Sequence, residues 1–211
     1  MVVRKDIKEF LNTIPNNVTI VAATKYVDSS SMRDLYHAGI TNLAENRVDS
    51  FLRKHDELSD LNITWHFIGH LQRNKARKVV GMIDCLHSLD SLDLASIIDK
   101  SRKTPLDCFI EVSINEKKNK NGISINMLKS FIEDCLQYHN IHIIGLMMMA
   151  IANSDKSSLH HQFSQLRELR DSLQNSLGIS LPYLSMGMSD DYLIAIKEGA
   201  THIRLGRILF K

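Results

Sequence analysis

The most constraining feature of this sequence is a regular alternation of short apolar runs with longer amphipathic segments. The apolar runs have the length of β-strands and lie at residues 18–25, 40–43, 63–68, 82–86, 106–112, 141–148, 183–186 and 202–205. A segment with helical periodicity follows each of the first seven. Strict alternation predicts a parallel sheet, and eight units predict its closure into a (β/α)₈ barrel, the TIM barrel. An open, doubly wound sheet is the alternative that this pattern leaves.

The chain shows no linker, no repeat of fixed period and no low-complexity segment, so its 211 residues predict a single domain over residues 1–211. Residues 1–14 carry charges within an apolar pattern, which favours an amphipathic helix ahead of the first strand over a signal peptide. No outer helix follows the eighth strand, and this extra N-terminal helix is available to cover its place.

Charge and cysteine content restrict the classes of partner and compartment. A net charge of +2 gives no reason to expect nucleic acid or an anionic membrane as a partner. No run approaches the roughly 18 apolar residues that span a bilayer. Cys85, Cys108 and Cys135 are odd in number and lack metal-type spacing. They predict neither a disulfide framework nor a metal site, and they favour a cytoplasmic location.

Lys25 ends the first apolar run, VTIVAATK. Lysine is seldom buried without a partner, so a lysine at the end of an apolar strand is unusual. In a TIM barrel the carboxyl ends of the strands face the active-site mouth, where a primary amine can form a Schiff base with a carbonyl compound. The alternative interpretation is a lysine that extends from a strand end into solvent.

The last two apolar runs end in loops suited to phosphate. Ser185, Gly187 and Ser189 lie at the end of the seventh run, ahead of a helix predicted over 189–198, and Gly206 follows the eighth. Barrel enzymes often bind phosphate in these loops, at a helix N-terminus with free N–H groups. The glycines allow close approach of the backbone, the serines offer hydroxyl groups, and Arg207 adds positive charge. An ordinary capped helix after a turn is the alternative.

Arg204 lies within the eighth apolar run, so its side chain is expected either to point into the barrel mouth or to pair with a carboxylate. Asp190 and Asp191 are interpreted as residues of the first helical turn that point to solvent. A strand-end lysine beside a phosphate site suggests pyridoxal 5′-phosphate (PLP), because the amine can hold its aldehyde while the loops hold its phosphate.

Several motifs in a fixed order resemble those of the PLP homeostasis proteins, a single-domain branch of the alanine-racemase-like barrels. The matching stretches are AATK (22–25), AEN (44–46), WHFIGHLQ with NK (65–75), NKNG (119–122), GLM (145–147), SMGMSDD (185–191) and RLG (204–206). The resemblance covers nearly the whole chain. It implies a fold-type III PLP-binding barrel without a C-terminal β domain.

The resemblance also implies roles for individual residues. Lys25 takes the Schiff-base position, and Arg204 takes the position that faces the pyridine nitrogen. The phosphate positions correspond to Ser185, Gly187, Ser189 and Gly206, and Asn46 corresponds to a position near the cofactor. Arg207 stands where many relatives have threonine, which leaves its contact with phosphate open.

Other residues of these motifs receive weaker expectations. Lys75 and Lys120 are candidates for a secondary role in handling PLP, although the run Lys117, Lys118 and Lys120 has the composition of a solvated loop. His66 and Met147 are expected to line the pocket. His66 and His70 lie four residues apart, too few ligands for zinc, so no metal site is expected.

The function implied by the resemblance is PLP homeostasis: the chain holds PLP as a Schiff base on Lys25 without obligatory turnover and passes it to apo PLP enzymes. We expect a monomer with no catalytic residues. The main alternative is a PLP-dependent amino-acid racemase, which needs acid–base groups on both faces of the bound substrate. A barrel that binds another phosphorylated metabolite without a Schiff base is a third hypothesis.

Overall fold

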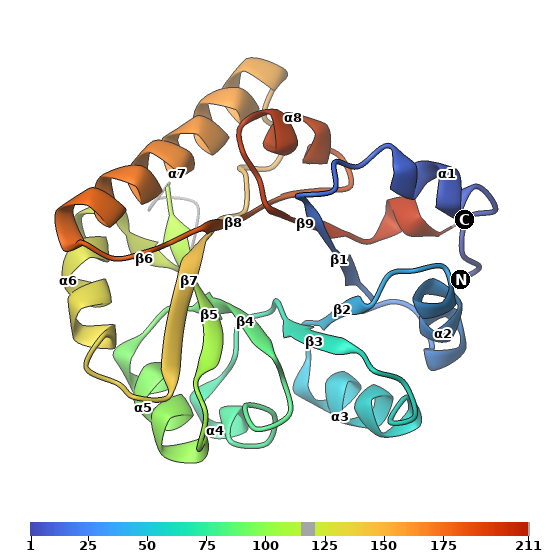
Figure 1. Cartoon of the computed structure of the whole chain (residues 1–211), viewed down its shortest axis with the longest axis horizontal. Helices are drawn as coiled ribbons and strands as arrows, with labels where there is room; N and C mark the ends of the chain where they lie inside the picture. The colour runs from blue at the N-terminus through green and yellow to red at the C-terminus, as the bar shows by residue number, and fades with distance from the viewer. Residues whose placement is uncertain (115–120, 211) are drawn as a thin grey trace.

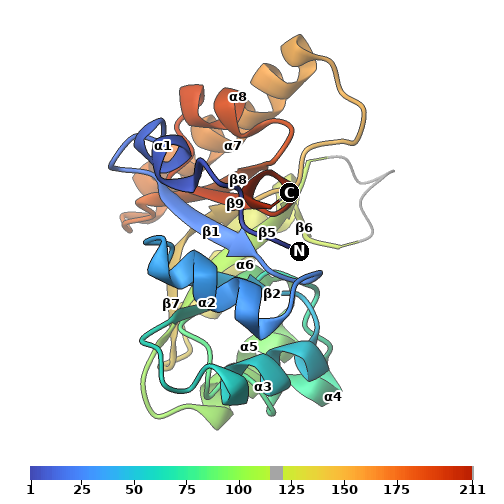
Figure 2. The ribbon, with the colours of Figure 1, turned by 90° about the vertical axis from the view of Figure 1, so that its right-hand side faces the viewer.

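The computed structural model describes residues 1–114 and 121–210, in which eight parallel strands form a closed barrel (Figures 1 and 2). The strands are β1 (Thr19–Ala23), β2 (Asn42–Glu45), β3 (Thr64–Phe67), β4 (Cys85–Leu89), β5 (Leu106–Ser113), β7 (Ile141–Met147), β8 (Tyr183–Met188) and β9 (His202–Leu205). They pair in this order, and β9 pairs with β1 to close the barrel. The TIM-barrel prediction is confirmed, and the open sheet is excluded.

Helices surround the barrel on its outer side, as Figure 1 shows. They are α1 (Ile7–Asn12), α2 (Ser29–His37), α3 (Val48–Glu57), α4 (Arg73–Ala76), α5 (Leu92–Ser101), α6 (Ile125–Cys135), α7 (Lys156–Leu177) and α8 (Tyr192–Lys197). A two-residue strand, β6 (Ile123–Ser124), pairs with the end of β5 outside the barrel and has no counterpart in the sequence prediction. Gly178 ends α7 in the left-handed conformation, as its position after Leu177 predicts.

The N-terminal helix takes the place of a missing outer helix. Figure 1 shows α1 between α8 and α2, on the outer side of β1 and β9. Ile7 and Phe10 bury their side chains there, and the Phe10 ring packs edge-on against Tyr192 of α8 at 6.1 Å between centroids. The helix covers only Ile7–Asn12 and is shorter than expected, because residues 1–6 run beside the C-terminal segment, with Val3 bridged to Phe210.

Two boundaries next to the predicted site differ from expectation. Strand β1 ends at Ala23, so Lys25 lies in the following turn, which the Val27 N–H closes on the Thr24 carbonyl at 3.0 Å. Helix α8 begins at Tyr192 instead of residue 189. Its start is delayed because the Asp191 carboxylate accepts the Met188 N–H at 2.5 Å and holds residues 188–191 in a turn.

The barrel interior and the layer between strands and helices form the hydrophobic core. All three cysteines, Cys85, Cys108 and Cys135, are buried and unpaired. Among the described residues no helix combines the length and apolar character needed to cross a membrane.

Candidate functional site

A cavity of about 360 Å³ opens at the carboxyl ends of β1, β8 and β9. It brings together four of the predicted site residues: Lys25, Ser189, Arg204 and Gly206. The remaining lining residues come from the chain ends and from the same turns: Met1, Ala23, Tyr26, Val27, Met188, Asp190, Arg207 and Phe210. Residues that lie far apart in sequence therefore meet because parallel strands end at one side of the barrel.

Lys25 is exposed, and its amine is available to a ligand in this cavity. The amine lies 4.8 Å from the centroid of the Tyr26 ring, which is 72% exposed. The structure gives the Lys25 amine this cation–π contact. Among the described residues, no carboxylate pairs with the ammonium group. The amine can therefore approach a carbonyl compound without first breaking an ion pair.

The loops after β8 and β9 converge on one oxygen atom. The Ser189 hydroxyl accepts the backbone N–H groups of Gly206, at 3.3 Å, and Ile208, at 3.5 Å. Both N–H groups lie at the start of the short 3₁₀ helix Arg207–Leu209, where backbone donors lack partners within the helix. Such a cluster of a hydroxyl and two N–H groups suits the oxygen atoms of a phosphate.

Arg204 lies beneath these loops, and its side chain is almost fully buried. Its Nη1 donates to the Ser185 carbonyl, at 2.8 Å, and to the Ser185 hydroxyl, at 2.6 Å, while Nη2 donates to the Met148 carbonyl at 2.8 Å. A guanidinium has five N–H donors, so two remain without a hydrogen-bond partner among the described residues. Burial lowers the pKa of Arg204 to about 10, and the nearby carboxylates of Glu111 and Asp191 oppose this shift. The group therefore keeps its charge at neutral pH.

Ser185 and Gly187 lie beneath the cavity and not in its lining. The Ser185 hydroxyl is bound by Arg204 and by His87 Nδ1, at 2.8 Å, so its geometry differs from the phosphate contact that the resemblance implies. Gly187 has a φ of 90°, and a Cβ there would lie 2.5 Å from the Ala195 Cβ. The glycine therefore allows α8 to pack closely on β8.

Asn46 lies in a neighbouring cavity of about 370 Å³ together with Lys75. The Asn46 Oδ1 atom is buried and has no hydrogen-bond partner among the described residues. The Lys75 amine lies 3.8 Å from the Asp49 carboxylate, at the edge of this cavity. Lys117, Lys118 and Lys120 fall outside the described residues, and the expectation for Lys120 stays a prediction.

Arg207 lines the first cavity, but its guanidinium pairs with Asp190 at 2.5 Å, and both side chains are largely exposed. The carboxylate of Asp190 thus neutralises the charge that the sequence offers for phosphate. Asp191 behaves differently from the expectation that it points to solvent. Burial raises the pKa of Asp191, and its carboxylate accepts the Met188 N–H instead.

A further cavity, of about 730 Å³, is an open depression beside the ends of β3 and β4. His70 lines it and pairs with Asp90 at 3.0 Å, while Arg73 pairs with Asp93. Its charged side chains thus neutralise one another.

His66 and Met147 do not line the first cavity, although the sequence predicts that they line the pocket. His66 lies apart from His70 and points into the barrel interior. Met147 is buried in the core.

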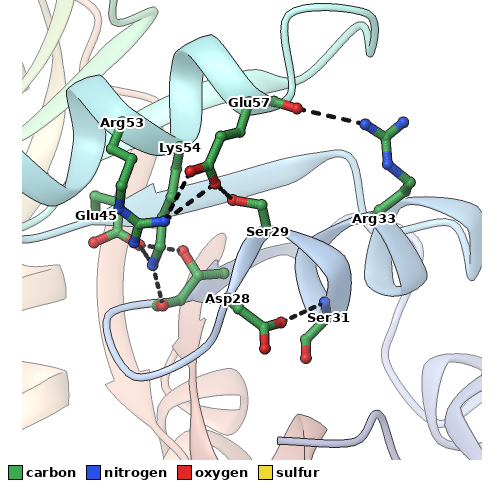
Figure 3. A network of polar contacts seen from close by, with 9 residues as sticks. Asp28, Ser29, Ser31, Arg33, Glu45, Arg53, Lys54 and Glu57 are labelled. Carbon is green, nitrogen blue, oxygen red and sulfur yellow. Dashed lines mark hydrogen bonds and ion pairs between the residues drawn. The ribbon is translucent and has the colours of Figure 1, made fainter.

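A buried ion pair beneath the Lys25 turn is absent from the sequence prediction. Lys54 of α3 donates to the Glu45 carboxylate at 2.6 Å and to the Thr24 carbonyl at 2.7 Å (Figure 3). The Thr24 hydroxyl contacts the same Glu45 oxygen at 2.7 Å, and the second Glu45 oxygen is buried with no partner within residues 1–114 and 121–210. The network fixes the backbone directly before Lys25. A lysine inside an amphipathic helix gives no sequence signal of this role, because such residues usually face solvent.

Three potential metal ligands also meet in the barrel interior, where nitrogen and sulfur atoms of His66, Cys85 and His87 lie within 4.8 Å of one another. Both imidazoles are engaged in hydrogen bonds, and burial raises the pKa of the Cys85 thiol well above its ordinary value. The Cys85 thiol is therefore protonated, and the hydrogen bonds of the two rings explain why these three side chains lie close together without a bound metal ion.

Comparisons with known proteins identify the family of this chain. Residues 3–211 match the family model of the alanine racemase N-terminal domain. The chain is 39% identical over 198 residues to the pyridoxal phosphate homeostasis protein of Aquifex aeolicus, a match that covers 92% of this chain and 87% of the relative. It is 34% identical over 215 residues to the protein of the same name from Schizosaccharomyces pombe, with 99% of this chain and 89% of the relative covered.

Solved structures give the same result. PipY of Synechococcus elongatus, solved without PLP and with PLP bound, matches with a TM-score of 0.91 and 34% identity over 97% of this chain and 100% of PipY. Alanine racemase from E. faecalis matches with a TM-score of 0.78 but only 12% identity, over 97% of this chain and 56% of the racemase, and it shows the fold alone. From the family model and the relatives together, the chain belongs to the alanine racemase N-terminal domain family and, within it, to the pyridoxal phosphate homeostasis proteins.

Proposed function

We propose that this chain binds PLP in the cavity lined by Lys25, Ser189, Arg204 and Gly206, and holds it by a Schiff base on Lys25 for PLP homeostasis. The single observation that carries the proposal is that a free amine, a phosphate-type cluster of donors and a buried arginine line the same cavity. The PLP-bound structure of PipY, 34% identical, supports the choice of ligand.

The residues present fit the parts of PLP. The Ser189 hydroxyl and the N–H groups of Gly206 and Ile208 would hold the phosphate. These two N–H groups already converge on the Ser189 oxygen, so all three donors lie close together. Arg204 would lie beside the pyridine ring, and Lys25 would supply the amine. When bound, PLP supplies an aldehyde that a lysine amine can attach reversibly.

A carrier role fits this cavity better than racemisation. Racemisation needs acid–base groups on two faces of the bound substrate. In the part of the cavity that the structure describes, the Asp190 carboxylate is paired with Arg207, and the Tyr26 ring lies against Lys25 itself. The proposal therefore assigns the chain no obligatory turnover and keeps an amino-acid racemase as the alternative.

The proposal extends to the setting of the protein. Residues 1–211 act as one PLP-binding domain and as a monomer, and the bound cofactor is given to apo PLP enzymes. Three free, buried cysteines support a reducing compartment, the cytoplasm.

The test begins with the absorption spectrum of the purified full chain with added PLP, before and after borohydride reduction. Peptide mapping then locates the adduct. We expect a visible band that disappears on reduction, with the label on Lys25. A colourless protein would refute PLP binding and leave the third hypothesis, a barrel for another phosphorylated metabolite. Racemisation of alanine by the loaded protein would refute the carrier role, and activation of an apo PLP enzyme by it would support that role.

A further inference from the structure

A continuous chain of hydrogen bonds crosses the barrel interior beneath the cavity. Arg204 Nη1 lies 2.6 Å from the Ser185 hydroxyl, and this hydroxyl lies 2.8 Å from His87 Nδ1. His87 Nε2 lies 2.9 Å from His66 Nδ1, and His66 Nε2 lies 3.0 Å from Asn42 Oδ1. The members come from β9, β8, β4, β3 and β2, so the chain ties five strands together.

The chemistry of the first member fixes the direction of this chain. Arg204 can only donate, so the Ser185 oxygen accepts, and its one hydrogen is directed to His87 Nδ1. His87 then carries its hydrogen on Nε2 and donates to His66, which donates from its own Nε2 to the Asn42 oxygen. The reverse direction would leave the Ser185 hydroxyl hydrogen without an acceptor among the described residues.

Burial keeps both rings neutral, which preserves this direction. Burial lowers the pKa of His66 to about 3 and lowers the pKa of His87 well below its ordinary value, with the charge of Arg204 contributing. The groups that face the two rings are His202 and Arg204 of β9, Cys85 of β4 and the Phe109 ring of β5, and none of them supplies a negative charge.

The link between Ser185 and Arg204 determines how the guanidinium is held. Two of its three hydrogen bonds go to Ser185, through the carbonyl and the hydroxyl oxygen. The hydroxyl is a good acceptor for Arg204 because its own hydrogen is engaged by His87. Without His87, the Ser185 hydroxyl hydrogen would lose its fixed acceptor, and one of the three hydrogen bonds that hold the guanidinium would weaken.

We propose that Ser185, His87 and His66 are positioning residues that lock the Arg204 guanidinium in one orientation toward the cavity, with Asn42 as the terminal acceptor. The inference rests on the proposed function only in naming PLP as the ligand that Arg204 meets. It gives Ser185 a task other than the phosphate contact expected from the sequence.

A metal ion held by His66, Cys85 and His87 is the competing explanation of the same cluster. The 2.9 Å separation between His66 Nδ1 and His87 Nε2 favours the hydrogen-bond chain, because one of these two atoms must then carry a hydrogen. Both nitrogens would have to be free of hydrogen to bind metal.

The first test needs no cofactor: the tautomers of the two rings are measured by ¹⁵N NMR of the full-length protein without PLP. We expect both rings to be neutral and protonated on Nε2 from pH 5.5 to 8.5. A His87 protonated on Nδ1, a ring that titrates in this range, or one equivalent of tightly bound zinc would overturn the proposal. These outcomes stand even where the protein fails to bind PLP.

The second test removes the hydroxyl in Ser185→Ala and compares this variant with Ser113→Ala, because Ser113 is a buried serine whose hydroxyl has no partner in the part of the chain that the structure describes. Loss of a hydrogen bond to a charged group predicts PLP binding weaker by about tenfold or more for Ser185→Ala, and no change for the control. The tautomer populations of both histidines are also expected to change in Ser185→Ala only. Unchanged populations and unchanged affinity would overturn the proposal.

His87→Phe provides a second variant with conserved packing, because His87 already stacks on Phe109 at 4.6 Å between centroids. Both changes act on the same hydroxyl, so the double variant Ser185→Ala/His87→Phe is expected to bind PLP no more weakly than the worse single variant. Losses in affinity that multiply would show that the two residues act independently and would overturn the chain.

Discussion

Lys25 is distinguished from the other lysines near the cavities by having no carboxylate beside it among the described residues, in contrast to Lys54 and Lys75, which face Glu45 and Asp49. Its side chain is exposed, so Lys25→Ala removes the amine and little packing. We expect Lys25→Ala to lose the reducible PLP absorbance band while its thermal unfolding midpoint stays within about 2 °C of the wild type, since surface substitutions change stability by at most about 0.5 kcal/mol.

The matched control is Lys8→Ala, which removes an exposed lysine on α1, away from the cavity lining. This variant is expected to keep the full absorbance band. A reducible band that persists in Lys25→Ala, mapped to another lysine, would move the Schiff-base role away from Lys25.

Gly187 allows close packing next to the loop that carries Ser189. Its φ of 90° disfavours any side chain, and a Cβ would also collide with Ala195. Backbone strain of about 1–2 kcal/mol and overpacking of about 1–3 kcal/mol predict that Gly187→Ala lowers the free energy of unfolding by about 2–5 kcal/mol. Urea titration monitored by circular dichroism measures this quantity.

Gly178→Ala separates the two causes, because Gly178 has a φ of 64° and a Cβ added there would meet no atom of the described residues within 4 Å. Only the backbone strain of about 1–2 kcal/mol is expected there. Equal losses in the two variants would show that the contact with Ala195 is unimportant.

The sequence is sufficient to place a residue at the cavity when the residue follows or ends a barrel strand. Lys25, Ser189, Arg204 and Gly206 follow or end parallel strands, so barrel topology alone brings them to one mouth. The prediction misplaces Ser185 because a residue near a strand end can face either the mouth or the interior, and a register shift between Ser185 and Met188 decides which. His87 carries no spacing signal at all inside a buried strand.

At the scale of elements, the Lys54–Glu45 pair connects α3 and β2 to the turn after β1 (Figure 3). Both side chains are buried, so removal of one charge leaves the other without compensation. Lys54→Met is therefore expected to lower the free energy of unfolding by about 3–5 kcal/mol, and the double variant Glu45→Leu/Lys54→Met to recover most of this loss. Chemical denaturation of the three proteins measures both effects.

Arg53→Ala is the control on the same helix. It breaks the exposed Arg53–Glu57 pair, and such pairs contribute about 0.3–0.5 kcal/mol. A loss for Lys54→Met as small as that for Arg53→Ala would contradict a role of the buried pair in fixing the turn before Lys25.

The sequence predicts the boundaries of elements less well than their order. The basic segment of about residues 72–80 predicts a helix along its length, but α4 covers only Arg73–Ala76, because turns close on residues 76–79 instead. Helix α8 starts late because Asp191 caps the preceding turn with its side chain. Local side-chain hydrogen bonds of this kind compete with helix formation and cannot be read from periodicity.

At the scale of the whole molecule, barrel closure is predictable because eight strand–helix units leave few other solutions. The β4–β5 and β9–β1 pairings complete the cylinder. The pairing of the N-terminal segment with the C-terminal segment beside the cavity is not predictable, since it depends on one bridge between Val3 and Phe210 and on the Arg4 N–H to the Leu209 carbonyl. Figure 2 shows the two ends at the same side of the barrel.

The same closed barrel makes stability depend on pH through its interior histidines. Burial lowers the pKa of His66 to about 3 and of His202 to about 4, and lowers that of His87 well below its ordinary value. In the unfolded chain these rings titrate near the ordinary value of about 6.5, so between about pH 6 and 4 the unfolded state binds more protons. The stability that the neutral rings contribute is therefore fully present above the pKa of the unfolded chain, about 6.5, and is lost as pH falls below it.

Each such histidine contributes a slope of up to about 1.4 kcal/mol per pH unit in the free energy of unfolding, so the three predict up to about 4 kcal/mol per unit. Burial raises the pKa of Glu111 and of Asp191, which opposes this loss in part.

His202→Phe, which keeps the ring contacts with Phe109 and Tyr183, is expected to reduce the slope by the contribution of one histidine. His161→Gln, an exposed position on α7, is expected to leave it unchanged. Urea unfolding at several pH values between about 6 and 4.5 measures the slope, and equal slopes for the wild type and His202→Phe would show that this ring is not held neutral by the barrel.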